Sequence, residues 1–331
     1  MNKKGIVAAG SIVVDTRYLI DAYPKKGNLT KIHYPMMTTG GLNNIVIDLA
    51  RLDGTLPIKV CGLIGEDAEG NLVKETLSKY PNIDISNILA RGRSTITYVM
   101  TEICSKERTF FFSHGDGGEF SIEDIDFPNL DADFFLLEYL LLLGDLDEKD
   151  EVYGTKGARV LKTAKEYGMK TIIDMVSEEK KDRYETVVRP ALKYVDYYIS
   201  NEIEAGGVVD DTLHDDTGIL EEKMWDALNT IKEFGVSEWV VVHSPAGAYG
   251  LDCKTGVTAK VPSIKLPDGY IRGTTGAGDA FGAGMIYGAY HGMDIEKALK
   301  IGNWCAACSL GGADSNSGVV PYANYPTIKL D

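Results

Sequence analysis

Short apolar segments and longer amphipathic segments alternate along most of the 331-residue chain. Runs rich in β-branched residues predict strands, and apolar residues spaced three and four positions apart predict helices. The expected strands are Ile6–Val14, Ile58–Ile64, Phe134–Leu143, Lys170–Met175, Tyr197–Ser200 and Trp239–His243. The expected helices are Ile45–Leu52, Glu66–Lys79, Val160–Tyr167, Ile219–Phe234, Ala277–Tyr290 and Ile295–Leu310. This alternation predicts an α/β fold, a three-layer, doubly wound and mostly parallel sheet with helices on both faces.

Two regions interrupt the alternation and predict a small additional sheet. Residues 16–37 carry Tyr-Pro and Gly-Asn turn signals between β-prone pieces. Ser94–Thr101 and Arg108–Phe112 flank a short polar segment that contains Lys106, which is typical of a β-hairpin. We expect a single α/β domain over residues 1–331, with segments at about 14–38 and 94–114 inserted within it. The alternative is a simple edge hairpin, which would leave three successive phenylalanines exposed.

The segment from Arg272 to Gly284, RGTTGAGDAFGAG, carries the most specific chemical signal. Its glycines and threonines precede Asp279, and the small apolar residues that follow, up to Tyr290, have the composition of a buried helix. A helix N-terminus offers unpaired amides and a positive dipole to an anion, and glycine lets the backbone approach that anion. An aspartate in the first turn either complements the helix dipole or accepts a proton from a hydroxyl that attacks the anion. The second interpretation indicates phosphoryl transfer to a hydroxyl.

Two other glycine-rich motifs do not match this segment. A Walker loop requires Gly-Lys-Ser or Gly-Lys-Thr, and neither tripeptide occurs in the chain. A dinucleotide fingerprint requires an acidic residue at the end of a second strand about 20 residues later. That distance falls near Ala298, within a segment that is typical of a helix. Neither motif is therefore present.

Five segments, in order along the chain, resemble the signatures of the ribokinase-like (PfkB) carbohydrate kinases. The loop described above resembles the second family signature, D-T-x-G-A-G-D followed by a small-residue helix. The others are GSIVVD at 10–15, GGLNN at 40–44 with the helix after it, NEIE at 201–204 and VVVHSPAGA at 240–248. The resemblance spans nearly the whole chain and implies the ribokinase-like form of the α/β fold. It also implies that the small sheet is a lid over the sugar, which pairs with another lid in a homodimer.

The resemblance implies an ATP- and Mg²⁺-dependent kinase that phosphorylates a hydroxymethyl group of a sugar. In this reading Asp279 is the base that takes the proton of the sugar hydroxyl. The expected anion hole consists of the amides of Gly276, Ala277 and Gly278. The expected sugar contacts are Asp15, Gly40, Gly41 and Asn44. The structural alternatives are a strand-end turn for Asp15 and a helix N-cap for Asn44, and Asn43 competes with Asn44 for the same role.

Further matched positions are expected on the ATP side. They are Asn201, Glu204, Ser244, Gly247, Thr274 and Asn303. By resemblance Glu204 organises Mg²⁺ largely through water, which suits an ion that keeps several waters. The alternative for Asn201 is a helix cap alone.

Three positions depart from the family pattern. Gly273 stands where the family usually has the aspartate that helps to hold a monovalent cation, so we expect activity to change little when Na⁺ replaces K⁺; a strong K⁺ requirement would refute this. Ser244 replaces a frequent glycine in the nucleotide-binding turn. Asp174 lacks the asparagine that often follows two residues later, so we assign it no role.

Two other functions remain open at this stage. A nucleoside kinase of the same fold would also present a ribose to an aspartate and a Gly-Gly-Asn segment. A catalytically idle sugar-binding relative would need no base, so the presence of Asp279 argues against it. A sugar phosphate is a less favoured substrate, because a second phosphate would require Arg or Lys near the lid, and Arg108 and Lys106 are the only obvious candidates there.

Composition limits the class of partner. The net charge of −15 argues against nucleic acid, whose phosphates attract Lys and Arg. No basic-then-apolar leader or membrane-length apolar run occurs, since the longest run, Phe134–Leu143, is interrupted by Glu138. Five scattered cysteines indicate reduced thiols and a cytoplasmic location. We expect Cys305 and Cys308, despite their spacing, to be ordinary buried residues.

Overall fold

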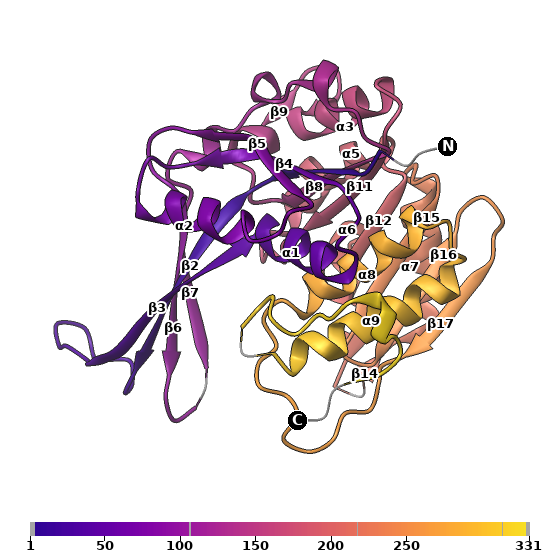
Figure 1. Cartoon of the computed structure of the whole chain (residues 1–331). Coiled ribbons are helices and arrows are strands. Elements are labelled where there is room, and N and C mark those ends of the chain that lie inside the picture. The colour runs from indigo at the N-terminus through magenta and orange to yellow at the C-terminus, as the bar shows by residue number, and fades with distance from the viewer. Residues whose placement is uncertain (1–3, 106, 217, 313, 329–331) are drawn as a thin grey trace.

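The computed structural model of the chain describes residues 4–105, 107–216, 218–312 and 314–328. Lys106 therefore lies outside the described residues. Figure 1 shows a body of sheet and helices, from which a small separate sheet projects.

Apolar strands build the large sheet, which has nine strands among the described residues. In spatial order they are β17 (Thr258–Pro262), β16 (Gly247–Asp252), β15 (Trp239–Ser244), β12 (Tyr197–Asn201), β11 (Lys170–Met175), β8 (Phe134–Leu140), β1 (Ile6–Gly10), β4 (Ile58–Ile64) and β5 (Ile83–Ala90). All neighbours from β5 to β15 run parallel, and β15, β16 and β17 pair antiparallel. The predicted mostly parallel α/β sheet is confirmed.

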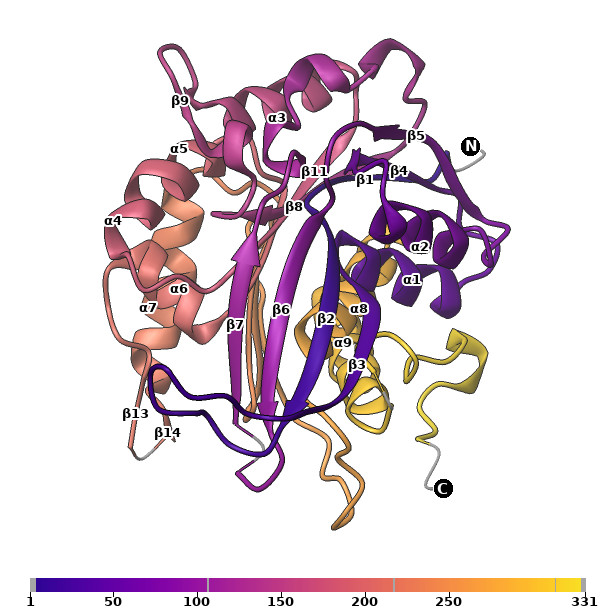
Figure 2. The same ribbon diagram turned by 90° about the vertical axis from the view of Figure 1, so that its left-hand side faces the viewer.

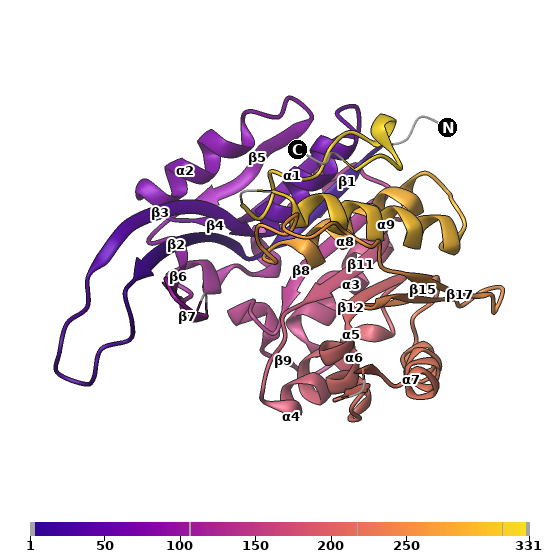
Figure 3. The same ribbon diagram turned by 90° about the horizontal axis from the view of Figure 1, so that it is seen from below.

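Helices cover both faces of this sheet (Figure 3). One face packs against α1 (Leu42–Leu52), α2 (Ala68–Leu77), α8 (Ala277–Tyr290) and α9 (Ile295–Leu310). The other packs against α3 (Lys156–Glu166), α5 (Arg189–Leu192), α6 (Glu202–Val209) and α7 (Glu221–Glu233). Along β1, Ile6 and Ala8 enter the first core while Val7 and Ala9 enter the second, as the two-residue period of a strand requires.

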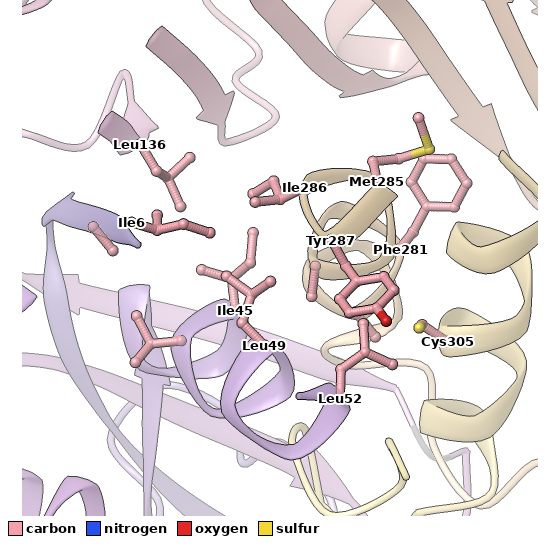
Figure 4. Close-up of a cluster of buried hydrophobic side chains, with 14 of the residues drawn as sticks. Ile6, Ile45, Leu49, Leu52, Leu136, Phe281, Met285, Ile286, Tyr287 and Cys305 are labelled. Carbon is pink, nitrogen blue, oxygen red and sulfur yellow. The ribbon is translucent and has the colours of Figure 1, made fainter. Parts of the chain in front are cut away.

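The first core fixes the helix that carries the glycine-rich loop. Figure 4 shows Ile45 of α1 beside Ile286 of α8 within one buried cluster. A Cβ on Gly284 would lie 2.7 Å from the Cα of Gly302, so the two glycines let α8 and α9 approach closely. Cys305 is buried in the same cluster, as the sequence predicted.

The interrupting regions form the small sheet. Its order is β3 (Ile32–Gly41), β2 (Ile12–Ile20), β6 (Thr95–Glu102) and β7 (Arg108–Ser113). Strands β2 and β3 are antiparallel, β2 and β6 are parallel, and β6 and β7 form the predicted hairpin. Figure 2 shows the four strands side by side in front of the body.

Several predicted boundaries were wrong. The expected strand Ile6–Val14 is two strands in two sheets, because the chain turns at Gly10, whose φ is +146°, and Ser11. The strand expected over Phe134–Leu143 ends at Leu140, where Tyr139 and Leu141 have positive φ.

The remaining elements are short. Strands β9 (Lys149–Asp150) and β10 (Gly154–Thr155) pair with each other, as do β13 (His214–Asp215) and β14 (Gly218–Ile219). Helix α4 (Lys181–Arg183) leads into a π-helical turn, Tyr184–Val188. Across the described part of the chain, no helix has the length and apolar character needed to cross a membrane.

Candidate active site

The glycine-rich loop and the base candidate lie at the carboxyl end of the parallel strands, where open α/β sheets bind ligands. Asp279 is in the first turn of α8, as expected, and its side chain is buried. Its Oδ2 accepts a hydrogen bond from Nδ2 of Asn44 at 2.8 Å, and its Oδ1 accepts one from the Tyr139 hydroxyl at 3.3 Å. The Ser315 hydroxyl donates to Oδ1 of Asn44 at 3.0 Å and so fixes the amide orientation.

Residues Gly276 to Gly278, which we call the anion loop because the sequence predicts an anion hole there, lie at the N-terminus of α8. Gly276 is the N-cap of α8 with φ +84°, and a Cβ there would lie 2.1 Å from the carbonyl oxygen of Ser315. At Gly278 the nearest heavy atom to a Cβ would be Cε1 of His243 at 3.5 Å. The backbone at the start of α8, including Ala277, therefore lines open cavities.

Carboxylates surround Asp279. Oxygen atoms of Glu138, Asp174 and Asp279 all lie within 4.8 Å of one another. Burial raises the pKa of Asp279 to about 6, although the hydrogen bonds from Asn44 and Tyr139 act to lower it. Burial, and next the Asp174 charge, hold the pKa of Glu138 well above its ordinary range. Glu138 is fully buried, and neither of its oxygens has a hydrogen-bond partner among the described residues.

The small sheet presents Asp15 to this region. Gly40 of β3 is required there, because a Cβ would lie 2.6 Å from Oδ2 of Asp15. Burial raises the pKa of Asp15, and the Arg17 charge and a hydrogen bond from Thr97 lower it. Gly41, with φ +59°, is the N-cap of α1.

The two asparagines at the start of α1 have different surroundings. Asn43 donates to the carbonyl oxygens of Gly40 at 2.7 Å and Val13 at 3.3 Å, which ties the turn together. Asn44 instead points to Asp279 and is not the helix cap. The geometry therefore favours Asn44 over Asn43 as the residue that faces Asp279.

A cavity of about 560 Å³ lies on the other side of the anion loop. Its lining includes Asn201, Ser244, Thr274, Phe281 and Asn303. The Ser244 hydroxyl donates to the Gly247 carbonyl at 3.1 Å and accepts from the Ala246 amide at 3.2 Å, so it closes the β15–β16 turn. Gly247 has φ +144°, and a Cβ at this position would lie 2.5 Å from the carbonyl oxygen of Val261.

Asn201 and Glu204 form a capping box at the start of α6. The Asn201 side chain accepts from the Glu204 amide at 2.9 Å, and Glu204 accepts from the Asn201 amide at 2.9 Å. The Ser177 hydroxyl also donates to Glu204, at 2.9 Å. Burial raises the pKa of Glu204 to about 7. Asn201 and Glu204 line a second cavity of about 220 Å³ together with Asp174 and Asp279.

Sequence reasoning missed Glu138, Tyr139 and Ser315, and it set Asp174 aside. One signal was available, since Glu138 is the single charge inside the longest apolar run. The others could not be found in the sequence, because Tyr139 turns toward Asp279 through a positive φ and Ser315 arrives from a distant loop.

Solved structures share this fold. The ribokinase from Thermotoga maritima has a TM-score of 0.76 and 20% identity, covering 96% of this chain and 97% of that one. The nucleoside kinase from Methanocaldococcus jannaschii has a TM-score of 0.74 and 16% identity, covering 97% and 96%. The fold is thus the ribokinase-like α/β fold, with its small separate sheet.

Residues 3–321 match the model of the pfkB family carbohydrate kinases, and the chain belongs to this family. An ATP-dependent ribose-1-phosphate kinase from Halopiger xanaduensis is 23% identical over 322 residues, 92% of each chain. The adenosine kinase of Schizosaccharomyces pombe is 22% identical over 246 residues, 73% of this chain and 70% of that one. An uncharacterized sugar kinase from Archaeoglobus fulgidus is 44% identical, but over 70 residues that span 26% of its length. The chain is a sugar or nucleoside kinase of the ribokinase family.

Proposed function

We propose that this chain transfers the γ-phosphoryl group of ATP to a hydroxymethyl group of a sugar. The observation that supports this most is the position of Asp279. It is a buried carboxylate in the first helical turn behind the anion loop, and it borders a cavity shared with Asn201 and Glu204. A site that only bound sugar would not need a buried carboxylate beside an anion-binding backbone.

The proposed role of Asp279 follows from its charge and its partners. The acceptor oxygen forms a bond to the γ-phosphorus, the bond from that phosphorus to the bridging oxygen breaks, and ADP leaves. Asp279 takes the hydroxyl proton as the acceptor attacks. A pKa of about 6 leaves Asp279 ionised at neutral pH and makes it a stronger base than an ordinary aspartate. The anion-loop amides stabilise the negative charge on the transferring group.

The acceptor is proposed to lie between the small sheet and α8. Asp15, with Gly40 and Gly41 behind it, accepts hydrogen bonds from two hydroxyls of the sugar. Asn44 of α1 lies next to the proposed base, because its side chain donates a hydrogen bond to Asp279 of α8. The small sheet then acts as a lid that limits the access of water.

The proposed ATP site is the cavity of about 560 Å³, which Thr274, Ser244 and Asn303 line. Gly247 does not line it and would act through the β15–β16 turn, where its carbonyl accepts a hydrogen bond from Ser244. Bound Mg²⁺ would neutralise phosphate charge. The carboxylate of Glu204 suits this hard cation, and because its oxygens already accept hydrogen bonds from Asn201 and Ser177, it would reach the ion through water. A cytoplasmic location would supply both ATP and Mg²⁺.

Substitution of Glu204 separates the metal role from the cap. Glutamine at this position keeps a capping box but removes the charge. We expect Glu204→Gln to retain the melting temperature within a few degrees and to raise the Mg²⁺ concentration for half-maximal activity about tenfold or more. An unchanged Mg²⁺ dependence in Glu204→Gln would contradict the metal role. The comparison variant is Asn201→Ala, whose melting temperature measures the effect of losing the helix cap.

A nucleoside is the second candidate acceptor. Asp15, Thr97 and Phe112 form one row across β2, β6 and β7, so an aromatic residue shares the sheet face of Asp15, two strands away from it. Such a ring could stack on a base. A relative is named adenosine kinase, which makes this candidate concrete.

The test is ADP release with MgATP against ribose, fructose, ketodeoxygluconate, ribose 1-phosphate, adenosine, inosine and cytidine. We expect turnover with one sugar, and identification of the product by phosphorus NMR gives the position of the new phosphate. Turnover confined to a nucleoside would favour the second candidate. If calorimetry detects binding of a sugar but no ADP forms, the chain is a catalytically idle relative.

A further inference from the structure

A further cavity lies outside the candidate active site. It has a volume of about 390 Å³ and lies between the end of α1, the end of α9 and the segment that leads into α8. Its lining includes Arg51, Tyr270, Arg272, Ser317 and Gly318. Among the residues that the structure describes, none lines both this cavity and either of the two cavities beside the anion loop. The proposed function therefore leaves this cavity unexplained.

The charge of this cavity differs from that of the chain as a whole. Two arginines, Arg51 and Arg272, line it, and within the described residues no aspartate or glutamate does. The chain carries a net charge of −15, so two cations without an acidic partner in one cavity are unexpected. A concave site with charges of one sign attracts a ligand of the opposite sign. The cavity therefore suits an anion.

The guanidinium of Arg272 is available to a ligand. The backbone amide of this residue donates to the Leu310 carbonyl at 2.9 Å, which fixes the point from which the side chain extends. The side chain is exposed and forms no hydrogen bond or ion pair with a described residue. A guanidinium is a planar fork of donors that matches the oxygens of a phosphoryl group.

Arg51 is held in place but keeps part of its donor set. Its Nε donates to the Val319 carbonyl and its Nη2 to the Ser317 carbonyl, both at 2.8 Å, whereas Nη1 has no partner in the described part of the chain. Asp48, three residues earlier in α1, is buried and makes no ion pair with it. Burial, and next the Asp279 charge, hold the pKa of Asp48 well above its ordinary range although the Arg51 charge lowers it, which favours the neutral acid. The charge of Arg51 is therefore not cancelled from this side.

The size and the walls of the cavity indicate a ligand larger than a bare phosphate ion. Its volume of about 390 Å³ lies within the range of small-molecule sites. Glycine at position 311 lets the Tyr270 ring pack against the end of α9, since a Cβ there would lie 2.5 Å from Cζ of Tyr270. The ring adds an apolar wall beside the two guanidinium groups. A phosphate monoester with an organic part as large as a sugar combines the two properties that this cavity recognises.

The cavity is next to the loop that orients Asn44. Ser315, which donates to Asn44, stands two residues before Ser317, whose carbonyl holds Arg51. Arg272 belongs to the segment that leads into α8. A ligand that contacts both arginines would therefore join this loop to that segment.

We propose that this cavity is a second ligand site, which binds a phosphate monoester of about the size of a sugar phosphate between Arg51 and Arg272. The Arg272 fork and Nη1 of Arg51 donate to the phosphoryl oxygens, and the organic part packs on Tyr270. The bound ester takes no part in phosphoryl transfer but restrains the loop that contains Ser315. This inference goes beyond the proposed function and does not depend on it.

Calorimetry with ribose 5-phosphate, in the presence of a saturating nonhydrolysable ATP analogue, tests the site without turnover. We expect the wild type to bind ribose 5-phosphate, and to bind inorganic phosphate more weakly because it lacks the organic part. Arg272→Gln should weaken ribose 5-phosphate binding about tenfold or more, as expected for the loss of a charge-assisted bidentate contact. Its melting temperature without ligand should stay within a few degrees of the wild-type value, because the side chain it replaces has no partner within the described chain.

Two control variants locate the bound ester. Arg93→Gln removes an exposed arginine beside Asp116 and outside all three cavities, and it should bind ribose 5-phosphate as the wild type does. Asp15→Asn changes the proposed acceptor site, and it should also keep the wild-type affinity for ribose 5-phosphate.

Amide hydrogen exchange gives a readout of the loop itself. Ribose 5-phosphate should slow exchange over residues 314–320 in the wild type and in Asp15→Asn, but not in Arg272→Gln. Unchanged exchange over these residues in the wild type with the ester bound would contradict the proposed restraint of the loop.

Three binding results would overturn the site. The first is a wild type that binds neither ribose 5-phosphate nor inorganic phosphate at millimolar concentration. The second is wild-type affinity in Arg272→Gln with a loss in Asp15→Asn, which would place the ester in the proposed acceptor site. The third is a lowered melting temperature in Arg272→Gln with unchanged affinity, which would make Arg272 only a partner for the carbonyl end of α9. Absence of turnover in the ADP-release assay would count against the proposed function alone.

Discussion

The surroundings of Asp279 disfavour its ionised form, whereas two hydrogen-bond donors stabilise that form. Burial and the nearby Asp15 raise its pKa from the ordinary 3.8 to about 6, and Asn44 and Tyr139 act in the other direction. The folded chain therefore binds this proton more tightly than the unfolded chain does. The contribution of Asp279 to the free energy of unfolding is lost as the pH rises from about 4 to about 6.

This balance predicts opposite pH effects on activity and on stability. We expect kcat/KM to fall about tenfold per pH unit below pH 6, because the base becomes protonated. Asp279→Asn should have a free energy of unfolding at pH 8 equal to or above that of the wild type, by up to about 3 kcal/mol. Urea unfolding at pH 4 and pH 8 measures the difference, which should grow with pH. The account would be contradicted if the free energy of unfolding of Asp279→Asn, measured relative to wild type, were lower at pH 8 than at pH 4.

At single residues, the sequence predicted the candidate residues Asp279 and Asn44, which the structure brings into contact, but it did not predict their surroundings. Asp279 and Asn44 could be placed because each stands at a fixed distance from a glycine turn and a helix start. The partners Tyr139 and Ser315 could not, because contacts across more than a hundred residues depend on the assembled fold. Glu138 was visible as an anomaly in an apolar run, but its proximity to Asp174 was not.

The start of α8 depends on a backbone conformation that only glycine adopts readily. Gly276 has φ +84° and contacts the Ser315 carbonyl, which also belongs to the loop that orients Asn44. Gly273, three residues earlier, has no heavy atom within 4 Å of a Cβ position. The two glycines form a natural pair for comparison.

Alanine at these two positions should have different effects. Gly276→Ala should cost about 1–2 kcal/mol or more from the left-handed conformation alone, displace the anion loop and remove most turnover. Gly273→Ala should leave both the melting temperature and kcat close to the wild-type values. Thermal unfolding and ADP-release assays measure both variants, and equal behaviour of the two would refute the importance of the Gly276 turn.

At the scale of elements, strands and helices with a clear period were predictable and their ends were not. The run Ile6–Val14 is continuous in the sequence, yet Gly10 and Ser11 divide it between two sheets. The β6–β7 hairpin was predicted from its turn, whereas β5 was missed, because an edge strand with half-exposed residues shows little periodicity.

For the whole molecule, the outer face of the small sheet indicates a partner. Met37, Thr16, Tyr98 and Phe111 form one row across the four strands, on the face opposite to Asp15. Met37, Tyr98 and Phe111 are 46%, 37% and 51% exposed, whereas Thr16 between Met37 and Tyr98 is buried, and large apolar side chains exposed on one face are typical of an interface. We propose that a second copy of the chain covers it, forming a homodimer through the lid.

This proposal predicts a change in mass from one substitution. The wild type should sediment as a dimer at micromolar concentration, and Phe111→Glu should sediment as a monomer. Val257→Glu, which places the same charge at an exposed apolar position in the β16–β17 connection, should remain a dimer. A wild type that is monomeric at every concentration would contradict the proposed dimer.

The most direct test of the central claim compares wild type and Asp279→Asn on the acceptor that gives the highest turnover. We predict that the variant loses about 10²-fold or more in kcat, as expected for a missing general base, while calorimetry gives the same affinities for the acceptor and for the ATP analogue. Near-normal turnover in Asp279→Asn would contradict the assignment of Asp279 and, with it, the proposed mechanism.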